Sequence, residues 1–248
     1  ERYYKNMKIK LGVIFDQKVS VGGGFTQSFQ TIKFLNSMSN DLFDPVYFTT
    51  FKENLILFKN ENIKVNFLKF NLLEKCIMKI SLLIKNNRMF NFYYKLFGFN
   101  AFEKKLLKNK IDLVYFLSPS SWSLYLNKLN YIITVWDICH RTNPEFEETG
   151  HMKIFFEREN FLMMSLPKAT AIITDSLSTK SDLIKYYRLI DERVKIIEFQ
   201  NRFTHNSEVN NKQIINDFNI NSNYVFYPAQ FWPHKNHAYI LEGIKTLK

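Results

Sequence analysis

The sequence predicts an α/β fold in which a parallel sheet is flanked by helices. Short runs of β-branched and aromatic residues alternate with longer segments of helical periodicity, as in right-handed βαβ units. Some short runs, such as Ile132–Val135, lack alternating polarity, which is typical of strands covered on both faces. The composition, 46% apolar and 17% aromatic, supplies a core and excludes a wholly disordered chain.

Seven runs rich in β-branched and aromatic residues are the expected strands: Lys10–Phe15, Val46–Thr50, Val65–Leu68, Leu113–Phe116, Tyr131–Trp136, Ala171–Asp175 and Val194–Phe199. The segments with helical patterns lie between them: Phe25–Ser39, Lys52–Asn60, Leu72–Lys85, Ala101–Asn109, Met152–Leu166 and Thr179–Tyr187. We expect these elements to form one domain over residues 1–200.

A polar, asparagine-rich stretch over residues 201–222 interrupts this alternation and predicts a linker, with a short helical stretch near Ile214–Phe218. After it, Tyr224–Tyr227 predicts a strand and the residues from about His237 to Lys248 a helix. Residues 223–248 would then begin a second α/β domain. A lone βα unit cannot bury its own sheet face, so we expect this second domain to be incomplete.

Positive charge is concentrated in one region of a chain whose net charge is +11. Between Lys69 and Lys110 there are ten Lys or Arg residues and two acidic ones. One apolar helical stripe runs through this region: Leu72, Cys76, Ile77, Ile80, Leu83 and Ile84, with Lys75, Lys79, Lys85 and Arg88 outside it and the aromatic run Met89–Phe99 after it. Either the region docks on an anionic membrane, or the stripe packs on the sheet beneath solvated lysines.

Two cysteines, Cys76 and Cys139, are too few for a disulfide framework and indicate a reducing compartment. The sequence shows neither a cleavable leader nor an apolar run of 18 residues. We therefore expect a cytoplasmic protein. If the basic region docks on a membrane, the protein associates peripherally with its inner face. Nucleic acid is not an expected partner, because no recognised reader motif accompanies the basic residues.

Gly22, Gly23 and Gly24 follow the first strand and open the first helix. Glycines at a helix start let backbone N–H groups approach a phosphate. The alternative is a flexible turn. Gln27 stands where a dinucleotide fingerprint requires its last glycine, which argues against a dehydrogenase, and no Gly-Lys-Ser/Thr follows to make a P-loop.

Asp137 and His140 come just after the fifth strand, at the sheet edge where α/β proteins collect ligands. Asp137 could hold sugar hydroxyls or orient His140, while His140 and Arg141 could contact anionic groups. The alternative is that Asp137 caps the next turn. Adjacent Cys139 and His140 lack metal-ligand spacing.

Lys235 precedes the last predicted helix, within a loop that runs from Pro228 to Asn236. A helix dipole disfavours a cation at its N-terminus, so a lysine there indicates a bound phosphate between the two. Gln230 and Asn236 lie in the same loop. A purely structural role for Lys235 is the alternative.

Taken in order, these segments resemble a retaining family-4 glycosyltransferase of the two-Rossmann (GT-B) type. The match rests on four blocks: the strand with Gly22–Gly24, the segment Ile133–Glu148 with its Asn-Pro-Glu-Phe, the segment Lys168–Ser176 followed by Ser181-Asp182-Leu183, and Tyr227–His237. The resemblance implies a Rossmann-like acceptor-side domain and the first βα unit of the domain that binds a nucleotide-sugar. It covers nearly the whole chain.

Two positions depart from the family pattern. Trp136 stands where many relatives have a histidine that touches the donor sugar, and Gln230 stands where they often have an arginine. Lys235 would then supply most of the charge for the diphosphate. The family's paired glutamates would follow well after Lys235, where only 13 residues remain.

The resemblance implies transfer of a hexose from a nucleotide-diphosphate-sugar to a glycan or lipid-linked acceptor, with retention and without a metal or other cofactor. Asp137, His140 and Lys235 would be the catalytic residues, and Gly22, Gly23, Gly24, Gln230, Lys235 and Asn236 would bind the nucleotide-sugar. We expect the 248-residue chain alone to be inactive. The alternatives are a sugar-nucleotide epimerase of the same architecture and a basic nucleic-acid- or membrane-binding module without catalysis.

Overall fold

The computed structural model describes residues 8–19, 22–38, 41–83, 100–199 and 215–246. The predicted aromatic run 89–99, the predicted stripe residue Ile84 and most of the predicted linker lie outside these ranges. The chain divides into two compact units. One comprises Glu1–Ile138 with Phe156–Glu198, and the other comprises Cys139–Phe155 with Phe199–Lys248.

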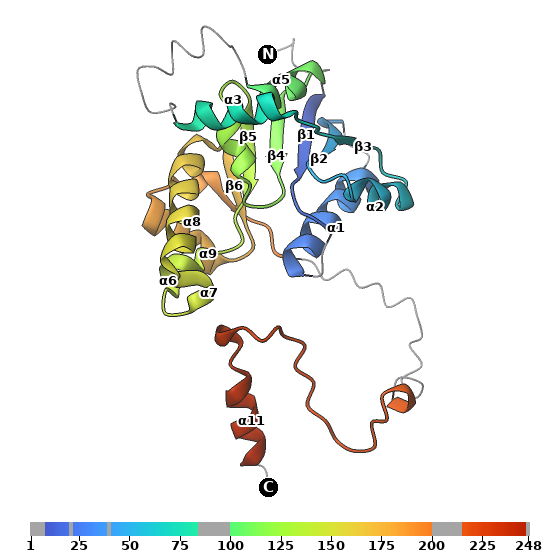
Figure 1. Cartoon of the computed structure of the whole chain (residues 1–248), viewed down its shortest axis with the longest axis vertical. Helices are drawn as coiled ribbons and strands as arrows, with labels where there is room; N and C mark the ends of the chain where they lie inside the picture. The colour runs from blue at the N-terminus through green and yellow to red at the C-terminus, as the bar shows by residue number, and fades with distance from the viewer. Residues whose placement is uncertain (1–7, 20–21, 39–40, 84–99, 200–214, 247–248) are drawn as a thin grey trace. The chain divides into compact units, whose positions relative to one another are not determined.

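The first unit is built on a seven-stranded, all-parallel sheet in the order β3-β2-β1-β4-β5-β6-β7 (Figure 1). The strands are β1 (Ile9–Phe15), β2 (Phe43–Thr49), β3 (Val65–Phe67), β4 (Leu113–Phe116), β5 (Asn130–Thr134), β6 (Ala171–Thr174) and β7 (Val194–Ile196). This confirms the seven predicted strands and the predicted fold class. The strand order reverses between β1 and β4, which makes that pair the topological switch point.

Helices connect the strands as the alternating pattern predicts. They are α1 (Gly23–Ser37), α2 (Asn54–Asn60), α3 (Leu72–Leu83), α5 (Ala101–Lys108), α8 (Met152–Ser165) and α9 (Leu177–Tyr187). The 3-10 turns are η1 (Ser121–Tyr125), η2 (Leu166–Lys168) and η3 (Asp191–Arg193). All six helices predicted for this part of the chain are therefore confirmed. No helix of the described residues is both long and apolar enough to cross a membrane.

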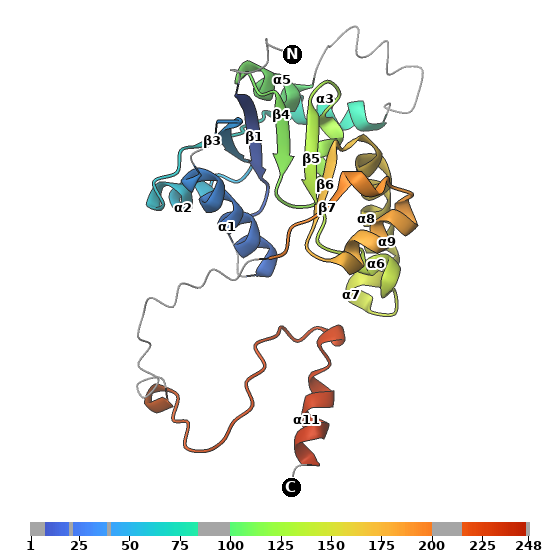
Figure 2. The same cartoon turned by 180° about the vertical axis from the view of Figure 1, so that it is seen from behind.

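The two faces of the sheet carry separate cores, because successive side chains of a strand point to opposite faces. On β1, Val13 and Phe15 join one cluster, with residues of α1 and α2, and Ile14 joins the other. That second cluster includes Met78 of α3 and residues of α5, α8 and α9. Figures 1 and 2 show the helices on either side of the sheet. Burial on both faces explains the continuous apolar runs in the sequence.

Helix α3 does not bury the stripe that its periodicity suggested. Met78 and Ser81 are its buried residues, whereas Leu72, Cys76 and Ile80 are exposed. The interpretation that this stripe packs on the sheet is therefore wrong for these three residues. Aliphatic side chains occur on several sides of α3, so contacts with α5 and η1, rather than the pattern, select the face that turns inward.

The second unit contains α6 (Cys139–Thr142), α7 (Glu147–Gly150), the 3-10 turn η4 (Pro233–Lys235) and α11 (His237–Lys245). Helix α11 confirms the predicted helix after Lys235. The predicted strand Tyr224–Tyr227 is wrong, because these residues form no ladder and Tyr224, Val225 and Phe226 are exposed. A strand needs a neighbour to bond its N–H and C=O groups, and none of the described strands pairs with it.

Candidate functional site

The carboxyl ends of the parallel strands gather polar side chains at one edge of the sheet. Asp16 follows β1, Thr50 follows β2, Ser120 follows β4 and Asp137 follows β5. Because β1 and β4 flank the switch point, Asp16 and Ser120 lie at the place where open α/β sheets bind ligands. This edge of the sheet is the candidate site of the first unit.

The glycine stretch begins α1 beside this edge. Gly22 is the N-cap residue, no side chain caps the helix, and its first turn contains no acidic residue. A Cβ added at Gly24 would lie 2.5 Å from two ring atoms of Trp136, while Cβ atoms at Gly22 and Gly23 would meet nothing within 4 Å. Glycine at position 24 is therefore required by the indole of Trp136. A role for Gly22 and Gly23 in binding phosphate stays a prediction.

Asp137 is held by an arginine that the sequence analysis did not single out. Arg158 of α8 forms an ion pair with the Asp137 carboxylate at 2.5 Å, and it also donates to the Asp137 backbone carbonyl at 3.2 Å. The pair is partly exposed. Arg158 lies 21 residues further along the chain, so no local spacing could have indicated it. The arrangement fixes the orientation of Asp137 at the end of β5.

His140 lies in α6 and is fully buried. Its ring meets Phe155 edge-on at 5.5 Å, and the Arg141 guanidinium lies 5.9 Å from the centre of the same Phe155 ring. In this conformation the imidazole has no exposed surface for a ligand. The predicted catalytic role of His140 therefore stays a prediction.

Lys235 is exposed at the end of η4, directly before the N-cap residue of α11. That residue, Asn236, has a left-handed backbone with φ of 46°, and its side chain accepts from the Tyr239 N–H at 3.2 Å. The Tyr227 hydroxyl donates to the Lys235 carbonyl at 2.9 Å. Gln230 accepts from the Trp232 indole at 2.6 Å. Short-range hydrogen bonds thus shape much of the loop before α11.

Besides Arg158, two more functional candidates were missed by sequence reasoning. The first is Glu148, whose Oε1 accepts from the His234 backbone N–H at 3.2 Å and lies 2.5 Å from the His234 ring Nδ1. Desolvation would raise the pKa of Glu148, but these hydrogen bonds hold it below its ordinary value. Phe146 meets the His234 ring edge-on at 5.9 Å. These contacts place α7 against the turn that carries Lys235, and both segments belong to the second unit.

The second missed candidate is Asp16. Its carboxylate accepts from the Ser120 hydroxyl at 2.5 Å, the Thr50 hydroxyl at 2.8 Å and the Trp122 indole at 3.1 Å. Burial raises the pKa of Asp16, and the three hydrogen bonds act in the opposite direction. The partners are 34 to 106 residues away in sequence. The signal in the sequence was only an acidic residue directly after a buried strand.

The predicted site residues fall into two groups, one in each unit. Gly22–Gly24 and Asp137 belong to the sheet unit, where Trp136 links the glycine stretch to the end of β5. His140, Gln230, Lys235 and Asn236 belong to the second unit.

No protein-family model and no curated protein matches the sequence. Among solved structures, the chain is similar to a glycosyltransferase from Rickettsia africae ESF-5, with a TM-score of 0.58 and 13% identity over 97% of this chain and 58% of that chain. It is also similar to the S. aureus MnaA–UDP co-structure, with a TM-score of 0.47 and 13% identity over 77% of this chain and 43% of that one.

The chain spans less than two thirds of the length of either structure. At this identity the likeness to the Rickettsia glycosyltransferase shows a shared fold. The chain is α/β and Rossmann-like.

Proposed function

We propose that this protein is a glycosyltransferase that uses a nucleotide-sugar. The sheet unit is the acceptor-side domain, and residues 223–248 begin the domain that binds the sugar donor. The reaction is transfer of a hexose, with retention of configuration, to a glycan or a lipid-linked acceptor. The shared fold with the Rickettsia africae glycosyltransferase supports the class of enzyme.

One observation carries this proposal. Helix α1 starts at the ligand-binding edge of the sheet with glycines at its first two positions, no acidic residue in its first turn and no side-chain cap. The first-turn N–H groups and the helix dipole favour an anion at such a terminus. A nucleotide-sugar carries its negative charge on the diphosphate, so the diphosphate is the group that we assign to this end of α1.

Lys235 is the residue of the second unit that we assign to phosphate binding. It is exposed beside the start of α11, and none of the ion pairs formed by the described residues involves it. The dipole of α11 disfavours a cation at this position unless an anion lies between the two. The contacts of Tyr227 with Lys235 and of Glu148 with His234 hold the backbone of this turn in place.

The chemical step needs stabilisation of a departing diphosphate. The bond between the anomeric carbon and the diphosphate oxygen breaks as positive charge develops on the sugar ring. The acceptor oxygen then bonds to the same face of that carbon, and its proton passes to the departing diphosphate. Backbone N–H groups at a helix start or a lysine ammonium can stabilise the developing negative charge. Asp137, oriented by Arg158, positions sugar hydroxyls. The role of His140, whose ring is buried, stays a prediction.

The test is turnover of UDP-, GDP- and ADP-linked hexoses by the full-length protein with glycan and lipid-linked acceptors. Lys235→Ala should lower kcat by a factor corresponding to roughly 2–4 kcal/mol of transition-state stabilisation. Lys245→Ala, at an exposed lysine of α11 paired with Glu242, is the matched control. Unchanged turnover in a folded Lys235→Ala protein contradicts the assignment. An epimeric nucleotide-sugar without a glycosylated product indicates an epimerase instead.

A further inference from the structure

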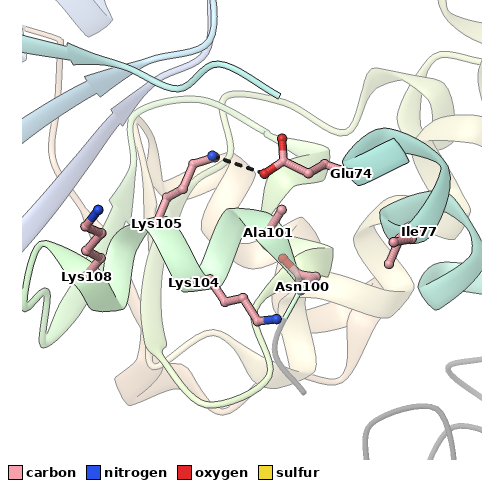
Figure 3. Close-up of a pocket in the computed structure, with 7 residues that line it drawn as sticks. All are labelled: Glu74, Ile77, Asn100, Ala101, Lys104, Lys105 and Lys108. Carbon is pink, nitrogen blue, oxygen red and sulfur yellow. Dashed lines mark hydrogen bonds and ion pairs between the residues drawn. The ribbon is translucent and has the colours of Figure 1, made fainter. Parts of the chain in front are cut away.

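Helices α3 and α5 form a basic, hollowed surface on the sheet unit. A pocket of about 280 Å³ lies between them (Figure 3). Its lining comes from both helices and consists of Glu74, Ile77, Asn100, Ala101, Lys104, Lys105 and Lys108. The lining thus combines three lysines, one carboxylate and the apolar side chains of Ile77 and Ala101. A ligand for this pocket must carry negative charge and tolerate apolar contact.

The one carboxylate does not neutralise the pocket. Glu74 accepts from the Asn71 backbone N–H at 2.8 Å and from the Lys105 ammonium at 3.2 Å. These bonds hold the pKa of Glu74 below its ordinary value and favour its ionised form, which is paired with Lys105. Lys104 and Lys108, both exposed, add two more positive charges at the rim.

The outer side of α3 places aliphatic residues in water beside more lysines. Leu72 is 82% exposed, Leu73 69% and Ile80 49%. Lys75 and Lys79 of the same helix are also exposed. Aliphatic surface exposed to water is unfavourable, and moving these side chains into the acyl region of a bilayer lowers the free energy. Leucines with neighbouring lysines are the composition of helices that lie in a membrane interface.

We propose that the surface formed by α3 and α5 docks on an anionic phospholipid bilayer. Leu72, Leu73 and Ile80 enter the headgroup–acyl boundary, and the lysines of both helices contact lipid phosphates. A second copy of the chain would place lysines against lysines. A nucleic acid would leave the leucines without a partner, since bases stack on aromatic rings. The inference depends only on this surface and does not require that the protein transfer sugar.

The experiment is flotation of the full-length protein with vesicles, without any sugar donor. One set of vesicles contains phosphatidylglycerol and phosphatidylcholine, and the other phosphatidylcholine alone. We expect binding to the anionic set only. The double variant Lys104→Glu/Lys108→Glu should weaken binding by about 25-fold or more, since each basic residue near an anionic surface contributes about fivefold. The double variant Leu72→Ser/Leu73→Ser should weaken it by about tenfold.

Matched controls separate this surface from general charge and hydrophobicity. Lys59→Glu/Lys64→Glu makes the same charge change at exposed lysines near α2 and β3, and Leu42→Ser/Ile56→Ser removes equally exposed aliphatic side chains. Both controls should bind as the parent does, and all variants should keep its melting temperature because every changed residue is exposed. Equal binding to neutral vesicles, equal losses in the controls, or tighter binding of a mixed-sequence RNA that survives Leu72→Ser/Leu73→Ser would overturn the proposal.

Discussion

The two segments assigned to phosphate binding, one in each unit, are held in different ways. The glycine stretch at α1 is fixed by distant parts of the chain, since Gly24 lies against Trp136 and the nearby edge is tied together through Asp16. The loop from Gln230 to Asn236 is largely exposed, and most of its hydrogen bonds join residues within a few positions of one another. Its distant contact is that of Glu148 with His234. Substitutions at the first segment should therefore change the stability of the sheet unit, and substitutions at the second only local order.

The largest effect is expected from Asp16→Ala. The change leaves the Ser120 hydroxyl, the Thr50 hydroxyl and the Trp122 indole without their acceptor at the end of β1. Because these donors lose their acceptor in a largely buried position, the substitution should lower the free energy of unfolding by about 3 kcal/mol. Urea denaturation followed by circular dichroism measures this loss.

Asp44→Ala is the matched control, because Asp44 lies exposed on β2. It should change the free energy of unfolding by less than about 0.5 kcal/mol. A loss at Asp16 no larger than at Asp44 would show that the carboxylate does not hold the strand ends together.

Gly24→Ala should have the next largest effect. The added methyl group would lie 2.5 Å from the Trp136 ring, so either α1 or the indole must shift. Overpacking of this kind costs about 1–3 kcal/mol. Gly23→Ala meets open space and gains helix propensity, so it should be neutral or stabilising by up to about 1 kcal/mol. Thermal unfolding of both variants checks the contrast, and equal destabilisation would rule out the Trp136 contact as its cause.

The sequence predicts the parts of the fold that depend on local pattern, and fails where distant contacts decide. The runs that form β4 and β6 match the structure closely because a buried parallel strand needs only continuous apolar residues. The face of α3 that turns inward was not predictable from its aliphatic residues. Tyr224–Tyr227 has strand-like residues but no partner strand among the described residues.

The candidate site likewise contains residues that local patterns predict and residues that only distant contacts reveal. Glycines after a strand and a lysine before a helix are visible as spacings, so Gly22–Gly24 and Lys235 could be singled out. Asp16, Arg158 and Glu148 act through partners at least 21 residues away. Such pairs exist only once distant parts of the chain have come together, and a single sequence contains no signal that joins them.

Asn236→Ala tests the second segment. It removes the side-chain acceptor at the N-cap of α11 and places alanine at a left-handed φ of 46°. The loss of such a cap costs about 1 kcal/mol. Amide hydrogen exchange of α11 should then speed up by about fivefold, while exchange in β1 and β4 stays unchanged. Equal acceleration in the strands would mean that the second unit unfolds together with the sheet, contrary to the comparison.

The smallest predicted effect is the pH dependence contributed by Asp16. Burial raises its pKa in the folded state above the ordinary value of 3.8, so the folded chain binds this proton more tightly than the unfolded chain. The contribution of Asp16 to stability is therefore largest below pH 3.8, falls as the pH rises through the folded pKa, and is constant above it.

Asp16→Asn isolates this contribution, since the amide is nearly isosteric and does not titrate. Its carbonyl can accept from Thr50 and Trp122, and the Ser120 hydroxyl can turn to accept from the amide. Subtracting the free energy of unfolding of Asp16→Asn from that of the parent cancels the other carboxylates. We expect this difference to decline with rising pH and then level off. A difference that rises with pH would mean that the three hydrogen bonds stabilise the ionised carboxylate more than burial disfavours it.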